Sequence, residues 1–273
     1  MTLNEIRELF KDFQGREAML RGITRYSVYH TMFYRSTLWS HSQQVAWVVT
    51  SIAPVAKRAF GDRFDTRKAQ LMALVHDDLE IIMGDVQLGN KTKMTPEQLR
   101  ALEEQEQQAI RAITQQFPES IGGYIYNDLL SAYQRIDGLE ATIVKYADKF
   151  CGFGESLHEA FGGNELFTVE IENEYGRIPT AYAIYIPYLR TFRERYPDIA
   201  PMFDGLLPLL EKPDMIDFSG VAVTRKPHTV SSLLNDSSYR PYKCWKQVIR
   251  AFADEEEWSN LYTQKEFPKP LAS

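Results

Sequence analysis

Capped segments in which apolar residues recur every three or four positions follow one another along most of this chain, and this pattern constrains the fold more than any other feature. Such spacing places the apolar side chains on one face of a helix, which must be buried against other elements. No sustained alternation of Val, Ile and Thr with polar residues indicates a sheet. The sequence therefore predicts an all-α helical bundle. The expected helices span residues 3–13, 40–59, 66–84, 96–117, 124–134, 139–161, 180–195 and 199–211.

Capping signals place several of the helix ends. Capping boxes are expected at residues 2–5 and 40–43, and the second of these puts His41 in the first turn of its helix. Pro54 should kink that helix or end it early, because its ring does not fit an undistorted helix interior. Residues 95–98, Thr-Pro-Glu-Gln, predict another capped start, and Gly84 suits the end of the helix before it.

The sequence changes character after Lys212, where Pro, Ser and Gly become frequent. We expect residues 1–211 to form one helical domain and residues 212–273 to form a C-terminal extension packed on it, with one helix around 242–253. The chain has 273 residues, of which 44% are hydrophobic, and this is enough apolar material for one sizeable core.

Composition also narrows the class of protein. The net charge of −6 gives no basic face for a nucleic-acid polymer, so no such partner is expected. No apolar run approaches the roughly 20 residues of a membrane span, and the polar start of the chain does not resemble a signal peptide. Cys151 and Cys244 are far apart and form no C-x-x-C pair, so we expect reduced thiols and a cytoplasmic protein.

Two histidines and two aspartates carry the chemistry that the sequence predicts. On a helix, His76 and Asp77 lie about 100° apart, so both can reach a cation beside it. His41 and Asp148, from two other predicted helices, would complete a set of two nitrogens and two oxygens. Such ligands suit Mn, Co, Fe, Ni or Zn, and a carboxylate-rich set tolerates Mg. The remaining coordination positions could take water and a phosphate oxygen, as hydrolysis of a phosphoester requires.

The order of these motifs resembles that of the HD-domain phosphohydrolases, and most closely the bacterial HD-domain 5′-deoxynucleotidases. The resemblance covers about residues 20 to 175 and implies an HD-domain helical bundle that binds one divalent metal ion and acts as a homodimer on a small nucleotide. The matching stretches are residues 23–26, 40–46, 76–86, 144–148 and 163–165.

The resemblance also implies roles for individual residues. It gives the metal ligands as His41, His76, Asp77 and Asp148. Glu80 and Asp85 would position or deprotonate the attacking water, while Arg25 would contact the substrate phosphate. Tyr26 stands where the family usually has Trp, and Arg35, six residues before His41, is a further candidate for nucleotide contact. Residues 86–91 depart from the Pro-rich loop of the family, which leaves the substrate specificity open.

Three functions fit this pattern. The first is a 5′-deoxynucleotidase, which converts a deoxynucleoside 5′-monophosphate to deoxynucleoside and phosphate. The second is a deoxynucleoside triphosphate triphosphohydrolase of phage type, with dATP as a candidate substrate, built on the same metal core. The third is an inactive HD module that binds a nucleotide or a partner, although the complete ligand set argues against it. We expect the lysines near the motifs to be ordinary solvated charges, namely Lys91, Lys93, Lys145 and Lys149.

Overall fold

A computed structural model describes residues 3–26, 29, 32, 36–86, 88–161, 164–167, 169–173, 176–178 and 181–203. Within these residues the fold is all-α, as predicted, with two small antiparallel strand pairs added. None of the described helices is both long and apolar enough to cross a bilayer. Arg35, the cap expected at Thr2, Cys244 and the proposed extension at 212–273 all lie outside the described residues.

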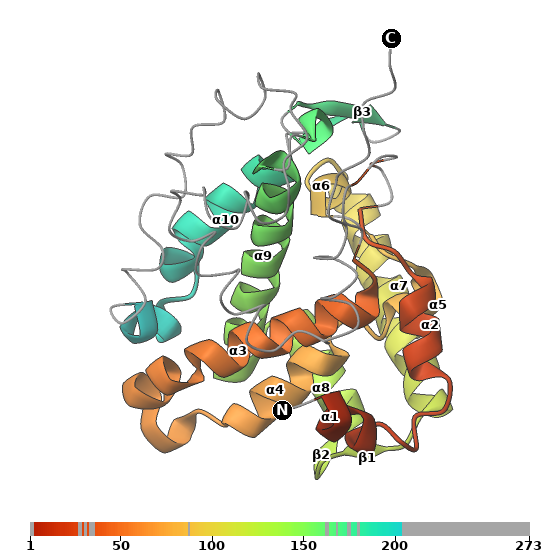
Figure 1. Ribbon diagram of the computed structural model, residues 1–273, viewed down its shortest axis with the longest axis vertical. Helices are drawn as coiled ribbons and strands as arrows, with labels where there is room; N and C mark the ends of the chain where they lie inside the picture. The colour runs from red at the N-terminus through yellow and green to blue at the C-terminus, as the bar shows by residue number, and fades with distance from the viewer. Residues whose placement is uncertain are drawn as a thin grey trace.

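Helices α3, α4, α8, α9 and α10 surround the main core (Figure 1). In the figure α9 stands beside α10, while α3 and α4 cross its lower end. The helices are α1 (Leu3–Leu9), α2 (Arg16–Gly22), α3 (Leu38–Phe60), α4 (Thr66–Val75), α5 (Glu80–Met83), α6 (Leu88–Lys91), α7 (Pro96–Gln116), α8 (Tyr126–Arg135), α9 (Gly138–Phe161) and α10 (Ala181–Arg195). Short 3₁₀ turns are η1 (Gly61–Arg63), η2 (Glu165–Phe167) and η3 (Pro197–Ile199). Strand β1 (Ser120–Ile121) pairs with β2 (Tyr124–Ile125), and β3 (Ile171–Asn173) pairs with β4 (Gly176–Ile178).

Helix α3 forms the centre of this core. Its apolar positions, such as Val45, Val49 and Ala56, are fully buried, and burial of one such aliphatic side chain as Val contributes about 1.5–3 kcal/mol. The helix continues through Pro54 to Phe60, so it does not end early at the proline. Pro54 faces solvent, where the loss of one backbone hydrogen bond is tolerated while the buried residues on either side hold the helix in place.

The start of α3 differs from the prediction. The N-cap is Thr37, three residues earlier than expected, because the Ser40 amide donates to the Thr37 hydroxyl and the Thr37 amide donates to the Ser40 hydroxyl. His41 still lies in the first turn, with its amide donating to the Thr37 carbonyl over 3.0 Å. The predicted capping box at Thr95 and Gln98 is confirmed at the start of α7.

The helix expected over residues 66–84 is interrupted at the motif. Helix α4 ends at Val75, and α5 begins only at Glu80. Between them the amides of Asp78 and Glu80 donate to carbonyls three residues earlier, each over 2.9 Å. This bonding pattern has about three residues per turn, so neighbouring side chains point in more widely separated directions than in an α-helix. His76 and Asp77 therefore face the site described next, while Asp78 faces the protein interior.

Candidate functional site

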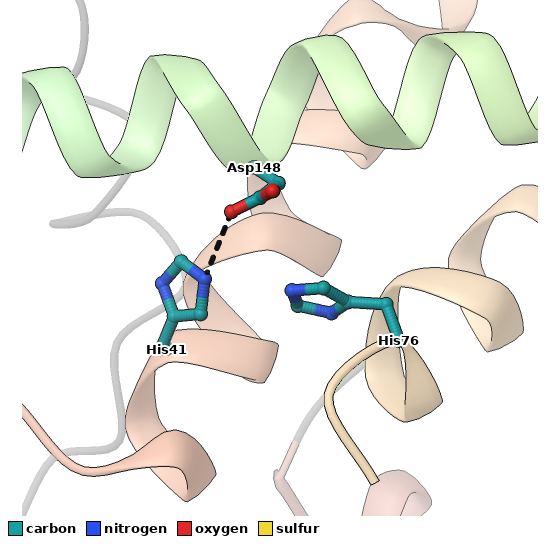
Figure 2. Close-up of side chains that lie close together, drawn as sticks. All are labelled: His41, His76 and Asp148. Carbon is teal, nitrogen blue, oxygen red and sulfur yellow. Dashed lines mark hydrogen bonds and ion pairs between the residues drawn. The ribbon is translucent and has the colours of Figure 1, made fainter. Parts of the chain in front are cut away.

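Three buried side chains from distant parts of the chain meet at one point. His41 comes from the first turn of α3, His76 from the end of α4 and Asp148 from the middle of α9. Each offers a ligand atom, and these atoms all lie within 4.8 Å of one another. Figure 2 shows the two imidazole rings and the carboxylate pointing toward a common centre. This cluster could hold a metal ion.

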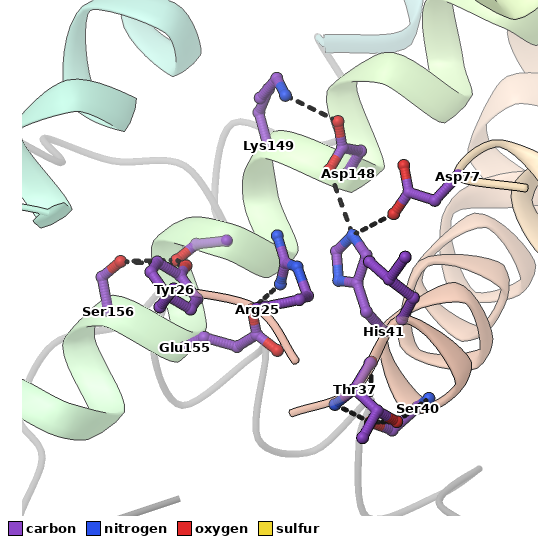
Figure 3. Close-up of polar contacts among 12 residues, drawn as sticks. Arg25, Tyr26, Thr37, Ser40, His41, Asp77, Asp148, Lys149, Glu155 and Ser156 are labelled. Atoms are coloured by element: carbon purple, nitrogen blue, oxygen red, sulfur yellow. Dashed lines mark hydrogen bonds and ion pairs between the residues drawn. The ribbon is translucent and has the colours of Figure 1, made fainter. Parts of the chain in front are cut away.

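The hydrogen bonds of the histidines fit a bound cation. His76 Nδ1 donates to the Ala73 carbonyl over 2.7 Å, which leaves Nε2 to face the centre. Nε2 lies 3.1 Å from an Asp77 oxygen without hydrogen-bond alignment, and it is buried with no hydrogen-bond partner. His41 Nε2 lies 3.3 Å from Asp148 Oδ1 and 3.7 Å from Asp77 Oδ2 (Figure 3). Asp77 thus approaches both imidazoles, beside the three residues that could hold a metal ion.

The electrostatics of the cluster also favour a bound cation. Burial acts to raise the pKa of Asp77, but the neighbouring His76 and His41 outweigh it and hold this pKa below its usual value. Burial likewise opposes ionisation of Asp148, and Lys149 and His41 lower its pKa. Burial and the charge of Arg25 lower the pKa of His41, which keeps its ring neutral. The pKa of His76 is raised despite burial because Asp77 lies beside it. A metal binds the neutral imidazole, so it should bind less tightly in acid.

Tyr133 on α8 orients part of this cluster, a contact that the sequence did not reveal. Its buried hydroxyl donates to Asp148 Oδ2 over 2.8 Å, and its ring meets the His76 ring edge-on with centroids 5.0 Å apart. The Lys149 ammonium also lies 2.8 Å from Asp148 Oδ2. These contacts leave Asp148 Oδ1 directed at His41.

We expect Tyr133→Phe to lower the affinity for Mn²⁺ by about 10- to 100-fold, since groups that orient metal ligands have effects of this size. Isothermal titration calorimetry on the folded variant would measure it. Tyr124→Phe is the matched control, because the Tyr124 hydroxyl donates to Asp65 and this tyrosine does not line the cavity. Equal Mn²⁺ affinity in the Tyr133→Phe variant and the wild type would contradict the orienting role.

The cluster opens into a cavity of about 160 Å³. Its lining combines charged residues with apolar and aromatic ones. The charged residues that line it are Arg25, Asp77, Glu80, Asp85, Lys91, Glu106, Lys145, Asp148 and Lys149, and the other residues include Tyr29, Leu88, Ile171, Ile178, Ile184, Tyr185 and Tyr188. A cavity with this mixed lining suits a ligand that has both an anionic group and an apolar or aromatic group.

Glu80 and Asp85 line the cavity together with Asp77. Glu80 Oε2 and Asp85 Oδ2 are both buried without a hydrogen-bond partner. Burial raises the pKa of Glu80 well above its usual value, and the nearby carboxylates Asp77 and Asp85 raise it further. Burial also raises the pKa of Asp85. Carboxyl groups of this kind can take up and release protons closer to neutral pH than ordinary ones.

Arg25 and Tyr26 line the cavity as well, but both are anchored to α9 (Figure 3). The Arg25 guanidinium pairs with the Glu155 carboxylate, and the Tyr26 hydroxyl donates to the Gly152 carbonyl over 2.9 Å. Glu155 is a second residue that the sequence did not reveal, because it lies 130 positions from its partner. The structure thus brings six of the predicted residues to one cavity, namely Arg25, Tyr26, Asp77, Glu80, Asp85 and Asp148. His41 and His76 lie behind them, against Asp148 and Asp77, and Arg35 is outside the described residues.

Comparisons with known proteins agree with this geometry. The chain is 33% identical over 132 residues to 5′-deoxynucleotidase YfbR of Escherichia coli K12, a match that covers 46% of this chain and 62% of that protein. It is 31% identical over 124 residues to a 5′-deoxynucleotidase of Vibrio cholerae, covering 45% and 62%. These matches span less than two thirds of the length of the curated relatives.

A solved structure shows the same fold. A conserved hypothetical protein from Pyrococcus furiosus superposes with a TM-score of 0.51 at 19% identity, covering 77% of this chain and 99% of that one. At this identity the likeness concerns the fold alone. The family described as 5′-deoxynucleotidase YfbR-like matches residues 13–196, which is more than half of the chain. The chain therefore belongs to the YfbR-like family of HD-domain 5′-deoxynucleotidases.

Proposed function

We propose that this protein hydrolyses deoxynucleoside 5′-monophosphates to deoxynucleosides and phosphate. The observation that carries the proposal is the buried cluster of His41, His76 and Asp148 beside a cavity that also holds two carboxyls of raised pKa. Membership of the YfbR-like family supports it. The apolar and aromatic part of the cavity gives the nucleoside a surface to contact.

The residues that would hold the metal are His41, His76, Asp77 and Asp148. A divalent ion such as Co²⁺ or Mn²⁺ would lower the pKa of water and polarise the phosphoryl group. Glu80 would accept the proton of the attacking water, because a buried carboxyl with a raised pKa is a better base than an exposed one. Asp85, beside it in the cavity, would hold the water in position.

We expect Glu80→Gln to lower turnover by about 10²- to 10⁴-fold, the usual contribution of a general acid or base, and to leave metal binding intact. The amide keeps the shape of the side chain but cannot accept the proton. Steady-state phosphate release and Mn²⁺ titration would separate the two effects. Glu106→Gln is the control, because Glu106 lines the same cavity but is paired with Lys91 over 2.9 Å. Turnover by Glu80→Gln within a few-fold of the wild type would remove Glu80 from the mechanism.

The activity itself is tested by following phosphorus products from a panel of nucleoside mono- and triphosphates with added Mn²⁺ or Co²⁺. We expect orthophosphate from deoxynucleoside 5′-monophosphates. Tripolyphosphate from a triphosphate, with no release from monophosphates, would instead indicate the triphosphohydrolase. Binding without release of either product would indicate an inactive nucleotide-binding module.

We also propose that the protein acts as a homodimer in the cytoplasm, as the family resemblance implies. Light scattering coupled to size-exclusion chromatography would measure its mass in solution. A mass equal to the 31.6 kDa of one chain would contradict the dimer.

A further inference from the structure

The positive charges that line the cavity differ in how they are neutralised. Among the described residues four cationic side chains line it. The Arg25 guanidinium pairs with Glu155, and the Lys149 ammonium lies 2.8 Å from Asp148. A third pair, between the Lys91 ammonium and Glu106, is 2.9 Å long. Among the described residues Lys145 has no carboxylate within ion-pair distance, so it is the lining cation without an ion pair, although Asp148 and Asp77 lie near enough to act on its charge.

Lys145 is held beside the metal cluster by an aromatic ring. Its ammonium lies 4.2 Å from the ring centroid of Tyr133, close enough for a cation–π contact. Tyr133 is the residue whose hydroxyl donates to Asp148 and whose ring meets His76. The ammonium is therefore adjacent to the ligands of the proposed metal, one helical turn before Asp148 on α9.

The protein environment leaves this ammonium ready for an anion. Burial lowers the pKa of Lys145 to about 8, with a further contribution from Lys149, so the group stays mostly protonated at neutral pH. A partly buried charge without a counter-ion is unfavourable unless a ligand supplies one. The expectation that Lys145 is an ordinary solvated lysine does not describe this position.

We propose that Lys145 binds the phosphate group of the substrate and is the side chain that distinguishes a deoxynucleoside 5′-monophosphate from its nucleoside. This inference rests on the proposed function. One unpaired lysine suits one phosphate group. The additional charges of a triphosphate would enter a cavity whose remaining cations are already paired and which also contains Glu80, Asp85 and Glu106.

The test measures binding without turnover. Protein kept metal-free with EDTA is titrated calorimetrically with dAMP and, separately, with deoxyadenosine. We expect the wild type to prefer dAMP, and Lys145→Met to lose at least about tenfold of that preference, since a hydrogen bond to a charged group contributes this much or more. Lys145→Arg should keep most of the preference because it keeps the charge.

Lys68→Met is the matched control, because it removes a lysine that is paired with Glu140 over 4.0 Å and does not line the cavity. It should retain the wild-type preference. Circular dichroism would verify the fold of each variant, and Lys145→Gln serves if the methionine variant does not fold. A wild type with no preference for dAMP, or Lys145 variants that keep the full preference, would overturn the inference.

Failure of this inference and failure of the proposed function give different results. Preference for dAMP through Lys145, together with no phosphate release from any monophosphate in the presence of Mn²⁺, would overturn the hydrolysis and leave the phosphate contact standing. Phosphate release by a Lys145→Met protein with unchanged dAMP preference would overturn the phosphate contact and leave the proposed hydrolysis standing.

Discussion

Replacing Asp77 with Ala is expected to abolish metal binding and to lower phosphate release by at least about 10³-fold, which corresponds to about 4 kcal/mol of transition-state stabilisation. The Asp77 carboxylate is the group that approaches both imidazoles, with its oxygens 3.1 Å from His76 Nε2 and 3.7 Å from His41 Nε2. Without it, two neutral nitrogens and Asp148 would have to hold a divalent ion with less negative charge.

The fold should survive this change. The Asp77 side chain is 14% exposed and its ion-pair contacts are with the two histidines, so truncation removes few packing contacts. We therefore expect the Asp77→Ala protein to keep its helical circular dichroism spectrum in EDTA, where neither protein carries metal. Wild-type protein treated with EDTA and then given Mn²⁺ should recover phosphate release, whereas the Asp77→Ala protein should not. Full Mn²⁺ occupancy in the variant, measured by elemental analysis, would remove Asp77 from the ligand set.

The sequence predicted those parts of the fold that depend on local signals. The reciprocal cap of Thr95 and Gln98 and the long apolar spacing of α9 placed these helices within one or two residues of where they lie. The candidate ligands were proposed because histidine and aspartate occur in an order that resembles that of the HD-domain phosphohydrolases. In the structure the ligand atoms of His41, His76 and Asp148 lie within 4.8 Å of one another, a proximity that the local sequence does not reveal.

The residues that the sequence missed act through contacts between distant elements. Tyr133 is a single tyrosine on an ordinary amphipathic helix, and nothing in its neighbours marks it as the partner of Asp148, 15 residues later. Glu155 faces Arg25 across 130 residues. Such pairs are decided by how helices pack, so a pattern of local spacing cannot predict them.

The interruption of the helix at His76 also depends on contacts between distant elements. Local spacing favours one helix through residues 66–84, but Asp78 is fully buried and makes its contacts on the side away from the metal cluster. The tight turns at residues 76–79 allow the Asp77 side chain to face the metal cluster while the Asp78 side chain faces the interior. The sequence shows the two aspartates side by side and gives no sign of this division.

Asp78 belongs to a buried network that supports the fold. Arg16 from α2 donates through Nε and Nη2 to the two Asp78 oxygens, over 2.7 and 2.6 Å, and the Tyr126 hydroxyl donates to the same carboxylate over 2.7 Å. The Arg16 and Asp78 side chains are only 2% and 0% exposed. The Arg16 guanidinium also lies over the Phe10 ring at 3.9 Å. Burial raises the pKa of Asp78 even though Arg16 opposes this, so its charge depends on that partner.

Arg16→Met is therefore expected to lower the free energy of unfolding by about 3–5 kcal/mol, because it leaves a buried carboxylate without its counter-ion. For a domain of this size the thermal midpoint should fall by roughly 6–20 °C. Urea denaturation of metal-free protein would measure the change. Arg7→Met is the control, since Arg7 makes an exposed ion pair with Glu17, and pairs of that kind contribute about 0–1 kcal/mol.

Adding Asp78→Leu to Arg16→Met tests whether the loss comes from the unpaired charge. The double variant removes both charges from the interior, so it should be more stable than Arg16→Met alone, as found when buried ion pairs are replaced by apolar groups. If the double variant were as unstable as the sum of the two single ones, packing and not charge would explain the loss. Folded Arg16→Met should also bind Mn²⁺ like the wild type. The two variants would then separate the roles of the two adjacent aspartates. Asp77→Ala would lose metal binding, whereas Arg16→Met, which removes the partner of Asp78, would lose stability.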